Sequence, residues 1–209
     1  GVYVLAVNTN HVADAALGYF INPLIAVLLG VVFLGERLNR LQTIAVVIAA
    51  VGVLQLTFLS GQAPVMALGM AISFGLYGLV KKQVNVSATA SLTAETLVVA
   101  PLALTYLVWL ETTGRGTLFT EGPSHTALLV LSGLITTIQL LLFGLAAKRL
   151  PLSTVGMIQY MTPTMQMLWA LFVTQEYLSP ARWVGFIIIW IAVAVYVFDL
   201  MRRSRSRSG

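Results

Sequence analysis

Cysteine is absent from this 209-residue sequence, and charged residues make up only 9% of it. Without cysteine, a disulfide framework and a thiolate metal site are excluded. Soluble domains carry about 25% charged residues. Hydrophobic residues make up 58%, and the mean hydropathy is +0.91, more than a soluble fold of this size can bury. The composition therefore predicts a membrane protein and argues against soluble nucleic-acid enzymes, secreted disulfide-rich domains and disordered chains.

Motifs of nucleotide-driven or hydrolytic chemistry are also missing from the sequence. There is no G-x-x-x-x-G-K-[ST], no H-E-x-x-H and no G-x-S-x-G. His11 and His125 stand at the ends of apolar runs and have no metal-ligand spacing. We interpret the Arg-Ser tail after Met201 as a basic cap on a membrane span rather than an RNA-binding repeat. We therefore expect no enzyme activity, no cofactor, no metal and no nucleic-acid partner.

Apolar runs of about 17 to 22 residues, the length of a membrane-spanning helix, dominate the chain. The segment 1–7 is also apolar but too short to span, and we interpret it as the end of a further span, so that the sequence is expected to be a fragment of a longer protein. The seven complete runs are 15–34, 41–59, 64–80, 92–110, 127–147, 153–174 and 181–200. The sequence thus predicts an all-α polytopic membrane protein.

Cationic residues are distributed unequally between the two sides that these spans define. Ten of the 12 Lys and Arg residues fall on the side of the C-terminus, and only Arg115 and Arg182 fall on the other. Because cytoplasmic loops are enriched in Lys and Arg, the distribution predicts a cytoplasmic C-terminus. It also explains the sequence pI of about 9.8 without an acidic partner.

An internal repeat relates the two ends of the chain. Pro23 precedes Glu36 by thirteen residues, and Pro163 precedes Glu176 by the same thirteen. A shift of 140 positions aligns 1–42 with 141–182 without a gap. The spans 15–34 and 153–174 are five spans apart and therefore run in opposite directions. The sequence predicts an inverted repeat, an arrangement common in secondary transporters.

Several motifs resemble EamA-type transporters of the drug/metabolite transporter superfamily, and most closely their RarD subgroup. The resemblance is carried by Leu-Gly-Tyr-Phe-Ile-Asn-Pro-Leu at 17–24, Phe-Leu-Gly-Glu-Arg at 33–37, Gly-Leu-Tyr-Gly-Leu-Val-Lys-Lys at 75–82 and Leu-Ser-Thr at 152–154. It implies a ten-helix bundle of two inverted five-helix repeats in the bacterial inner membrane, of which about seven complete helices and a stub are present here. Residues 1–60 would end the first repeat, residues 64–200 would form the second, and residues 201–209 would be a cytoplasmic tail.

Polar residues inside the spans are the candidates for a substrate cavity, because an amide or hydroxyl facing lipid would lack hydrogen bonds. Helical spacing groups them on four faces, each belonging to a different span. The alternative interpretation is interhelical packing, in which Gln, Ser and Thr bond neighbouring helices. The candidates are Tyr19 and Asn22; Ser73 and Tyr77; Ser132, Thr136 and Gln139; and Gln159, Thr162, Gln166 and Trp169.

Prolines and carboxylates supply candidates for movement and coupling. Pro23 and Pro163 each remove a helical hydrogen bond, so we expect a kink, and a hinge is one interpretation. Glu36 and Glu176 end their spans on opposite sides, where they would form alternate gates with Arg37 or Arg40 and with Arg182, or would be solvated helix ends. Glu95 is the carboxylate inside a span, either a proton relay or a side chain reaching the interface.

No span carries Lys or Arg at its middle, which disfavours strongly anionic substrates. The sequence therefore favours a secondary transporter, expected to be an exporter of small neutral, zwitterionic or amphipathic metabolites or drugs. The resemblance also implies an association with chloramphenicol sensitivity. A facilitative channel-like permease and a polytopic membrane protein without transport activity are the alternatives. Proton coupling and a homodimer stay open; the small-molecule substrate and the lipid bilayer are the expected partners.

Overall fold

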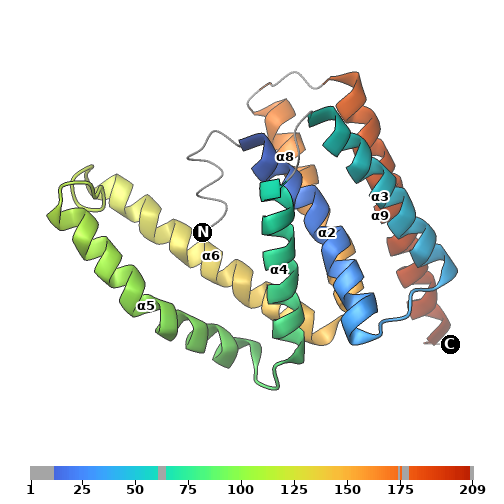
Figure 1. The fold of residues 1–209 in the computed structure, drawn as a ribbon, viewed down its shortest axis with the longest axis horizontal. Coiled ribbons are helices and arrows are strands. Elements are labelled where there is room, and N and C mark those ends of the chain that lie inside the picture. Colours follow the sequence, from blue (N-terminus) through green and yellow to red (C-terminus); the bar gives the residue numbers. More distant parts are fainter. Residues whose placement is uncertain (1–11, 61–64, 174, 176–178, 208–209) are drawn as a thin grey trace. The chain divides into compact units, whose positions relative to one another are not determined.

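The computed structural model describes residues 12–60, 65–173, 175 and 179–207. Throughout this part of the chain the regular elements are helices, which confirms the all-α prediction (Figure 1). The segment 1–7 and Glu176 lie outside the described residues. The helices are α2 (Val12–Leu34), α3 (Arg40–Ser60), α4 (Val65–Gln83), α5 (Ala88–Thr112), α6 (Pro123–Arg149), α7 (Leu152–Gln159), α8 (Met161–Phe172) and α9 (Pro180–Arg207).

Each predicted span coincides with one helix except the span 153–174, which the structure divides into α7 and α8. Among the described residues, α3, α5, α6 and α9 are long and apolar enough to cross a membrane. Runs of Leu, Ile, Val and Ala become helices in lipid because only a helix satisfies its own backbone hydrogen bonds there. The prediction of a multi-pass membrane protein is thereby confirmed.

Polar side chains set the start of two helices. Asn39 Oδ1 accepts a hydrogen bond from Gln42 N at 3.0 Å, and Gln42 Oε1 accepts one from Asn39 N at 3.2 Å. This reciprocal capping box begins α3. Ser87 begins α5 in the same manner, since its hydroxyl oxygen accepts a hydrogen bond from Ala90 N at 3.1 Å.

The chain folds into two compact units. The first unit holds residues 1–80 and 150–209, and the second holds residues 81–149. In the first unit, α3 packs along α9 (Figure 1). A Cβ atom at Gly52 would lie 2.9 Å from Ile189 Cγ1, and one at Gly185 would lie 2.6 Å from Leu56 Cδ2. The two glycines therefore permit the close approach of these helices, as small residues do in membrane bundles.

The second close pair of the first unit is α2 and α7. A Cβ atom at Gly156 would lie 2.7 Å from the carbonyl oxygen of Pro23 and 3.0 Å from Ala26 Cβ. Pro23 is itself fully buried. The sequence positions 23 and 156 therefore meet in the core of the first unit, where α7 lies directly against the proline-containing turn of α2.

The second unit is a hairpin of α5 and α6, joined through residues 113–122. Glu111 Oε1 accepts a hydrogen bond from Leu118 N at 3.0 Å within this connection. Only 6% of the apolar stretch of either helix is buried. Side chains such as Val98 and Leu102 are more than 70% exposed, and such apolar surface is stable only against lipid or further protein.

Candidate substrate-binding and gating residues

The boundary between α7 and α8 is a break in the helical hydrogen-bond ladder. Pro163 has no N–H to donate, and its ring excludes the carbonyl of the residue four positions earlier. Tyr160 N donates to Met157 O at 3.3 Å, which closes a turn tighter than that of an α-helix. The regular helical bonds begin again where Thr164 N donates to Tyr160 O at 3.3 Å. The predicted distortion at Pro163 is confirmed as a break one turn before the proline.

Pro23 behaves differently from Pro163. It lies inside α2, which continues without interruption from Val12 to Leu34. Pro23 therefore does not divide α2 into two helices, and the kink expected there stays a prediction. Tight packing of Gly156 against the Pro23 carbonyl oxygen holds this turn in the core, so the lost hydrogen bond does not divide the helix. Whether either proline acts as a hinge stays a prediction.

Asn22 and Gln159 form a polar contact between α2 and α7. Asn22 Nδ2 donates to Gln159 Oε1 at 3.2 Å, across 137 positions of sequence. Asn22 directly precedes Pro23, and Gln159 is the last residue before the helix break. Asn22 Oδ1 and Tyr160 Oη are buried and have no hydrogen-bond partner among the described residues. Two candidate cavity residues are thus brought together beside unused hydrogen-bonding capacity.

The remaining candidates on α8 lie at the surface of the first unit. Thr162, Gln166 and Trp169 are all exposed, and the exposed fraction of Trp169 is 63%. For these three side chains the described part of the chain offers no hydrogen bond. Tyr19, on α2, is 36% exposed. Thr162, Gln166 and Trp169 therefore make no hydrogen bond to a neighbouring helix within the described part of the first unit.

The other predicted faces satisfy their hydroxyl groups locally. Ser73 Oγ donates to Gly69 O at 2.7 Å, Ser132 Oγ to Leu129 O at 2.7 Å, and Thr136 Oγ1 to Ser132 O at 2.8 Å. Such bonds to the preceding turn are the local alternative to bonds between helices. Gln139 is exposed in the second unit, and the ring of Tyr77 lies 5.9 Å from that of Phe74.

Glu36 lies against the N-terminus of α7. Its carboxylate accepts hydrogen bonds from Leu152 N, from Ser153 N at 2.9 Å and from Ser153 Oγ at 2.7 Å. Backbone N–H groups at a helix N-terminus have no intrahelical partner, so a carboxylate there is stabilised by hydrogen bonding and by the helix dipole. Pro151 at the N-cap provides no side-chain bond, and Glu36 takes over this role.

The gate carboxylates were predicted to lie beside arginine side chains. Arg37 or Arg40 was expected beside Glu36, and the structure instead shows the α7 N-terminus there, with both arginines exposed. A gate that involves Glu36 and either arginine stays a prediction. The proposed mate, Glu176, is outside the described residues.

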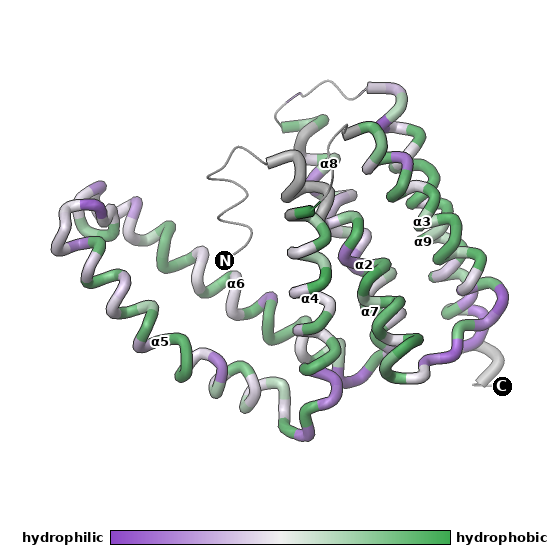
Figure 2. The backbone as a smooth tube through the Cα atoms, viewed as in Figure 1, coloured by the Kyte–Doolittle hydropathy of each residue, from purple (hydrophilic) through white to green (hydrophobic). Residues whose placement is uncertain are grey.

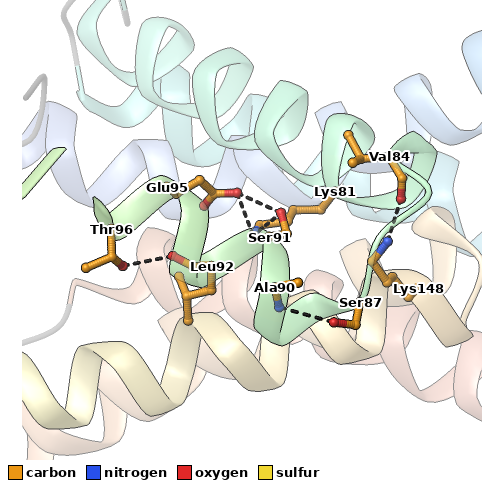
Figure 3. Close-up of polar contacts among 9 residues, drawn as sticks. All are labelled: Lys81, Val84, Ser87, Ala90, Ser91, Leu92, Glu95, Thr96 and Lys148. Carbon is orange, nitrogen blue, oxygen red and sulfur yellow. Dashed lines mark hydrogen bonds and ion pairs between the residues drawn. The ribbon is translucent and has the colours of Figure 1, made fainter. Parts of the chain in front are cut away.

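Glu95 belongs to a polar cluster with Lys81 and Ser91 (Figure 3). Lys81 Nζ lies 2.7 Å from Glu95 Oε1 and donates to Ser91 Oγ at 2.9 Å. Ser91 Oγ donates to Glu95 Oε1 at 2.9 Å. The side chain of Lys81 is 2% exposed and that of Glu95 is 42% exposed. Glu95 is therefore an ion-pair partner of a buried ammonium group.

Sequence reasoning missed Lys81, although a signal was present. Ser91 and Glu95 are four residues apart and share a helical face, and a short turn separates them from the last turn of α4. Two further lysines hold the same corner of the second unit. Lys82 Nζ donates to Ala147 O at 3.2 Å, and Lys148 Nζ donates to Val84 O at 2.6 Å, so each caps the end of the other's helix.

Sequence reasoning also missed Asp199, near the end of α9. Its side chain is 3% exposed, accepts a hydrogen bond from Asn39 Nδ2 and pairs with Arg203 at 3.2 Å. The signal in the sequence was a carboxylate at the end of an apolar run. Among the described residues, no group of three or more His, Cys, Asp or Glu side chains could hold a metal ion.

Discontinuous helices with polar groups beside the break are common in membrane transporters. The EamA-like transporter family model matches residues 1–58 and 62–198. The chain belongs to this family, and within it to the group that includes RarD.

Named relatives extend this assignment. The chain is 44% identical over 210 residues to a Streptomyces exfoliatus protein named RarD, covering 99% of this chain and 67% of the relative. It is 40% identical to RarD of Escherichia coli K12, covering 99% and 70%, and 44% identical to the uncharacterized transporter YojE of Bacillus subtilis, covering 98% and 68%. A Pseudomonas aeruginosa relative, 32% identical, bears the name chloramphenicol-sensitive protein RarD, with 100% of this chain and 70% of that protein covered.

Proposed function

We propose that this chain serves a secondary exporter of small neutral, zwitterionic or amphipathic solutes in the bacterial inner membrane. The contact that carries the proposal joins Asn22 to Gln159 at 3.2 Å beside the break between α7 and α8. Transporters bind solutes where helices are interrupted near the middle of the membrane, because freed backbone and amide groups are available there. Asn22 Oδ1, buried and unbonded in the described part, supplies such an acceptor.

The chemistry of the candidate groups favours solutes without a strong net charge. Amides, hydroxyl groups and the indole of Trp169 recognise polar but uncharged atoms and flat apolar surfaces. The buried cation in the described part of α4, Lys81, already has Glu95 as a partner. A strongly anionic solute would therefore have to compete with a carboxylate held 2.7 Å from the ammonium nitrogen.

Alternating access requires contacts that close one side of the bundle and then release. The bonds from Leu152 and Ser153 to Glu36 tie the connection after α2 to the start of α7. Because ten of 12 cationic residues lie on the C-terminal side, we assign this contact to the cytoplasmic side. Its release, together with bending at Tyr160, would open the bundle to the cytoplasm.

Efflux from cells tests this proposal. Transport-deficient bacteria producing the full-length protein are loaded with labelled chloramphenicol or with single neutral amino acids, and efflux is followed with and without a protonophore. We expect faster efflux of at least one compound. Replacement of Asn22 by Leu or of Gln159 by Met should slow it about fivefold, the effect of losing one hydrogen bond of about 1 kcal/mol.

The matched control is Gln83→Met, which removes an exposed amide at the end of α4 and should leave efflux unchanged. Efflux that saturates and shows counterflow indicates a carrier, and efflux without either property indicates a channel-like permease. Wild-type efflux in both the Asn22 and the Gln159 variants would refute the binding site at the break.

A further inference from the structure

Arginines gather where α3 begins and α9 ends. Arg37 and Arg40 lie in and after the connection from α2, and Arg202 and Arg203 lie in the last turns of α9. A hydrogen bond from Asn39 Nδ2 to Asp199 Oδ2 joins these two segments. Figure 2 shows the change from hydrophobic helices to hydrophilic residues at this end of α3 and α9. We call these four residues the arginine end.

Acidic neighbours do not neutralise the arginine end. The Glu36 carboxylate is engaged by the N-terminus of α7. Asp199 is 3% exposed, and the described structure pairs it with Arg203. Arg37, Arg40 and Arg202 are exposed, and the described residues provide no ion pair to any of the three. The surface therefore has a net positive charge that the described protein leaves uncompensated.

The arginine end also lies at the boundary of the apolar segments. The candidate membrane span of α3 runs from Arg40 to Leu59, and that of α9 runs from Pro180 to Arg203. The apolar segment of α3 thus begins at Arg40, and that of α9 ends at Arg203. The two helices pack against each other. Side chains at the end of a membrane span are at the depth of the lipid headgroups.

We propose that the arginine end is a binding site for anionic phospholipid headgroups. Guanidinium groups donate paired hydrogen bonds that match the oxygens of a phosphate. A lipid phosphate held by Arg40 and Arg202 would join the start of α3 to the end of α9 beside the Asn39–Asp199 bond. The lipid thereby stabilises the contact between two spanning helices. This inference rests on membrane insertion and not on the transported solute.

Lipid preference of the purified full-length protein tests the site. Native mass spectrometry compares bound phosphatidylglycerol with bound phosphatidylcholine of the same acyl chains, and thermal unfolding is followed in both lipids. The test variant is Arg37→Gln/Arg40→Gln/Arg202→Gln, which retains Arg203 and its pair with Asp199. Each exposed arginine near an anionic surface contributes about 1 kcal/mol, or about fivefold in affinity. We expect the preference for phosphatidylglycerol to fall about a hundredfold in the triple variant, and its thermal stabilisation to disappear.

Two controls separate charge from folding defects. The same three positions changed to Lys should keep most of the preference, and Arg115→Gln/Arg182→Gln, remote in sequence from the arginine end, should keep all of it. An unchanged preference in the glutamine variant would overturn the proposal. So would equal stabilisation by inorganic phosphate at the same ionic strength, which would indicate a site for a soluble anion.

Discussion

Glu36 and Ser153, 117 positions apart in sequence, are joined by two hydrogen bonds: Ser153 donates to the Glu36 carboxylate from its backbone N at 2.9 Å and from its hydroxyl at 2.7 Å. The contact links the connection after α2 to the start of α7. A charged acceptor at a helix N-terminus is stronger than a neutral one, because its hydrogen bonds are charge-assisted and the helix dipole adds to them. Loss of the negative charge should therefore weaken the contact more than it changes local packing.

Replacing Glu36 by Gln should lower the free energy of unfolding by about 2 kcal/mol, the cost of weakening charge-assisted bonds at a helix N-terminus. Thermal unfolding of the purified full-length protein in detergent measures the effect. Arg37→Gln, at the exposed neighbouring position, serves as the control and should melt like the wild type. Equal melting temperatures for Glu36→Gln and wild type would show that the contact does not stabilise the fold.

Gly30→Ala should disturb the same contact. A Cβ atom at position 30 would lie 2.7 Å from Glu36 Oε2 and 3.2 Å from Ser153 N, so the carboxylate would have to move. The matched control is Gly69→Ala in α4, where a Cβ atom meets nothing within 4 Å. We expect Gly30→Ala to lower the melting temperature and Gly69→Ala to leave it equal or raise it, because Ala favours a helix over Gly by about 1 kcal/mol. Additive effects of Gly30→Ala and Glu36→Gln would argue against a shared mechanism.

Replacing one member of the Lys81–Glu95 pair should lower the free energy of unfolding more than replacing both members. Glu95→Gln leaves the ammonium group of Lys81, which is 2% exposed, without its counter-charge. The expected loss is about 3 kcal/mol, the lower end of the range for a broken buried pair, since Glu95 is 42% exposed. The double variant Lys81→Met/Glu95→Leu should recover most of it, as measured by thermal unfolding. A double variant less stable than Glu95→Gln would contradict this account.

The same double variant tests proton coupling. If Glu95 carries protons during transport, efflux from cells producing Lys81→Met/Glu95→Leu should no longer respond to a protonophore, although the protein folds. Efflux that keeps its response would assign Glu95 to structure alone. Membrane abundance, measured by immunoblotting, controls for expression.

Gln166→Leu and Trp169→Ala should each slow transport without lowering membrane abundance, because both side chains are exposed on α8. We expect at least a fivefold effect, equivalent to about 1 kcal/mol. Leu168→Ala, at an exposed apolar position of the same helix, is the control. Unchanged efflux kinetics in both test variants would place this face against lipid or another helix.

A reporter enzyme that is active only in the periplasm, fused after Gly209, should stay inactive, because most cationic residues lie on the C-terminal side. The paired control is the same reporter inserted in the connection 113–122, which should be active. The reverse pattern would overturn the orientation and would move the Glu36 contact to the periplasmic side.

The fold class and the extent of most helices could be predicted because both depend on local sequence. A run such as 41–59 is apolar along its whole length, and the structure forms α3 over Arg40–Ser60. The same reasoning could not distinguish two prolines of the same spacing. Pro163 accompanies a break and Pro23 does not, since Gly156 packs α7 against the turn that contains Pro23.

By itself, the sequence determined membrane insertion and the number of apolar segments, because hydropathy over about 20 consecutive residues is a property of the segment alone. Its short motifs indicated the family. Only the tertiary structure decided which polar groups meet. Asn22 bonds Gln159, Glu36 bonds Ser153 and Lys81 pairs with Glu95, and each pairing depends on how helices dock against one another. Docking is governed by close contacts at small residues such as Gly30 and Gly156, and a single sequence does not show which helix a given face will contact.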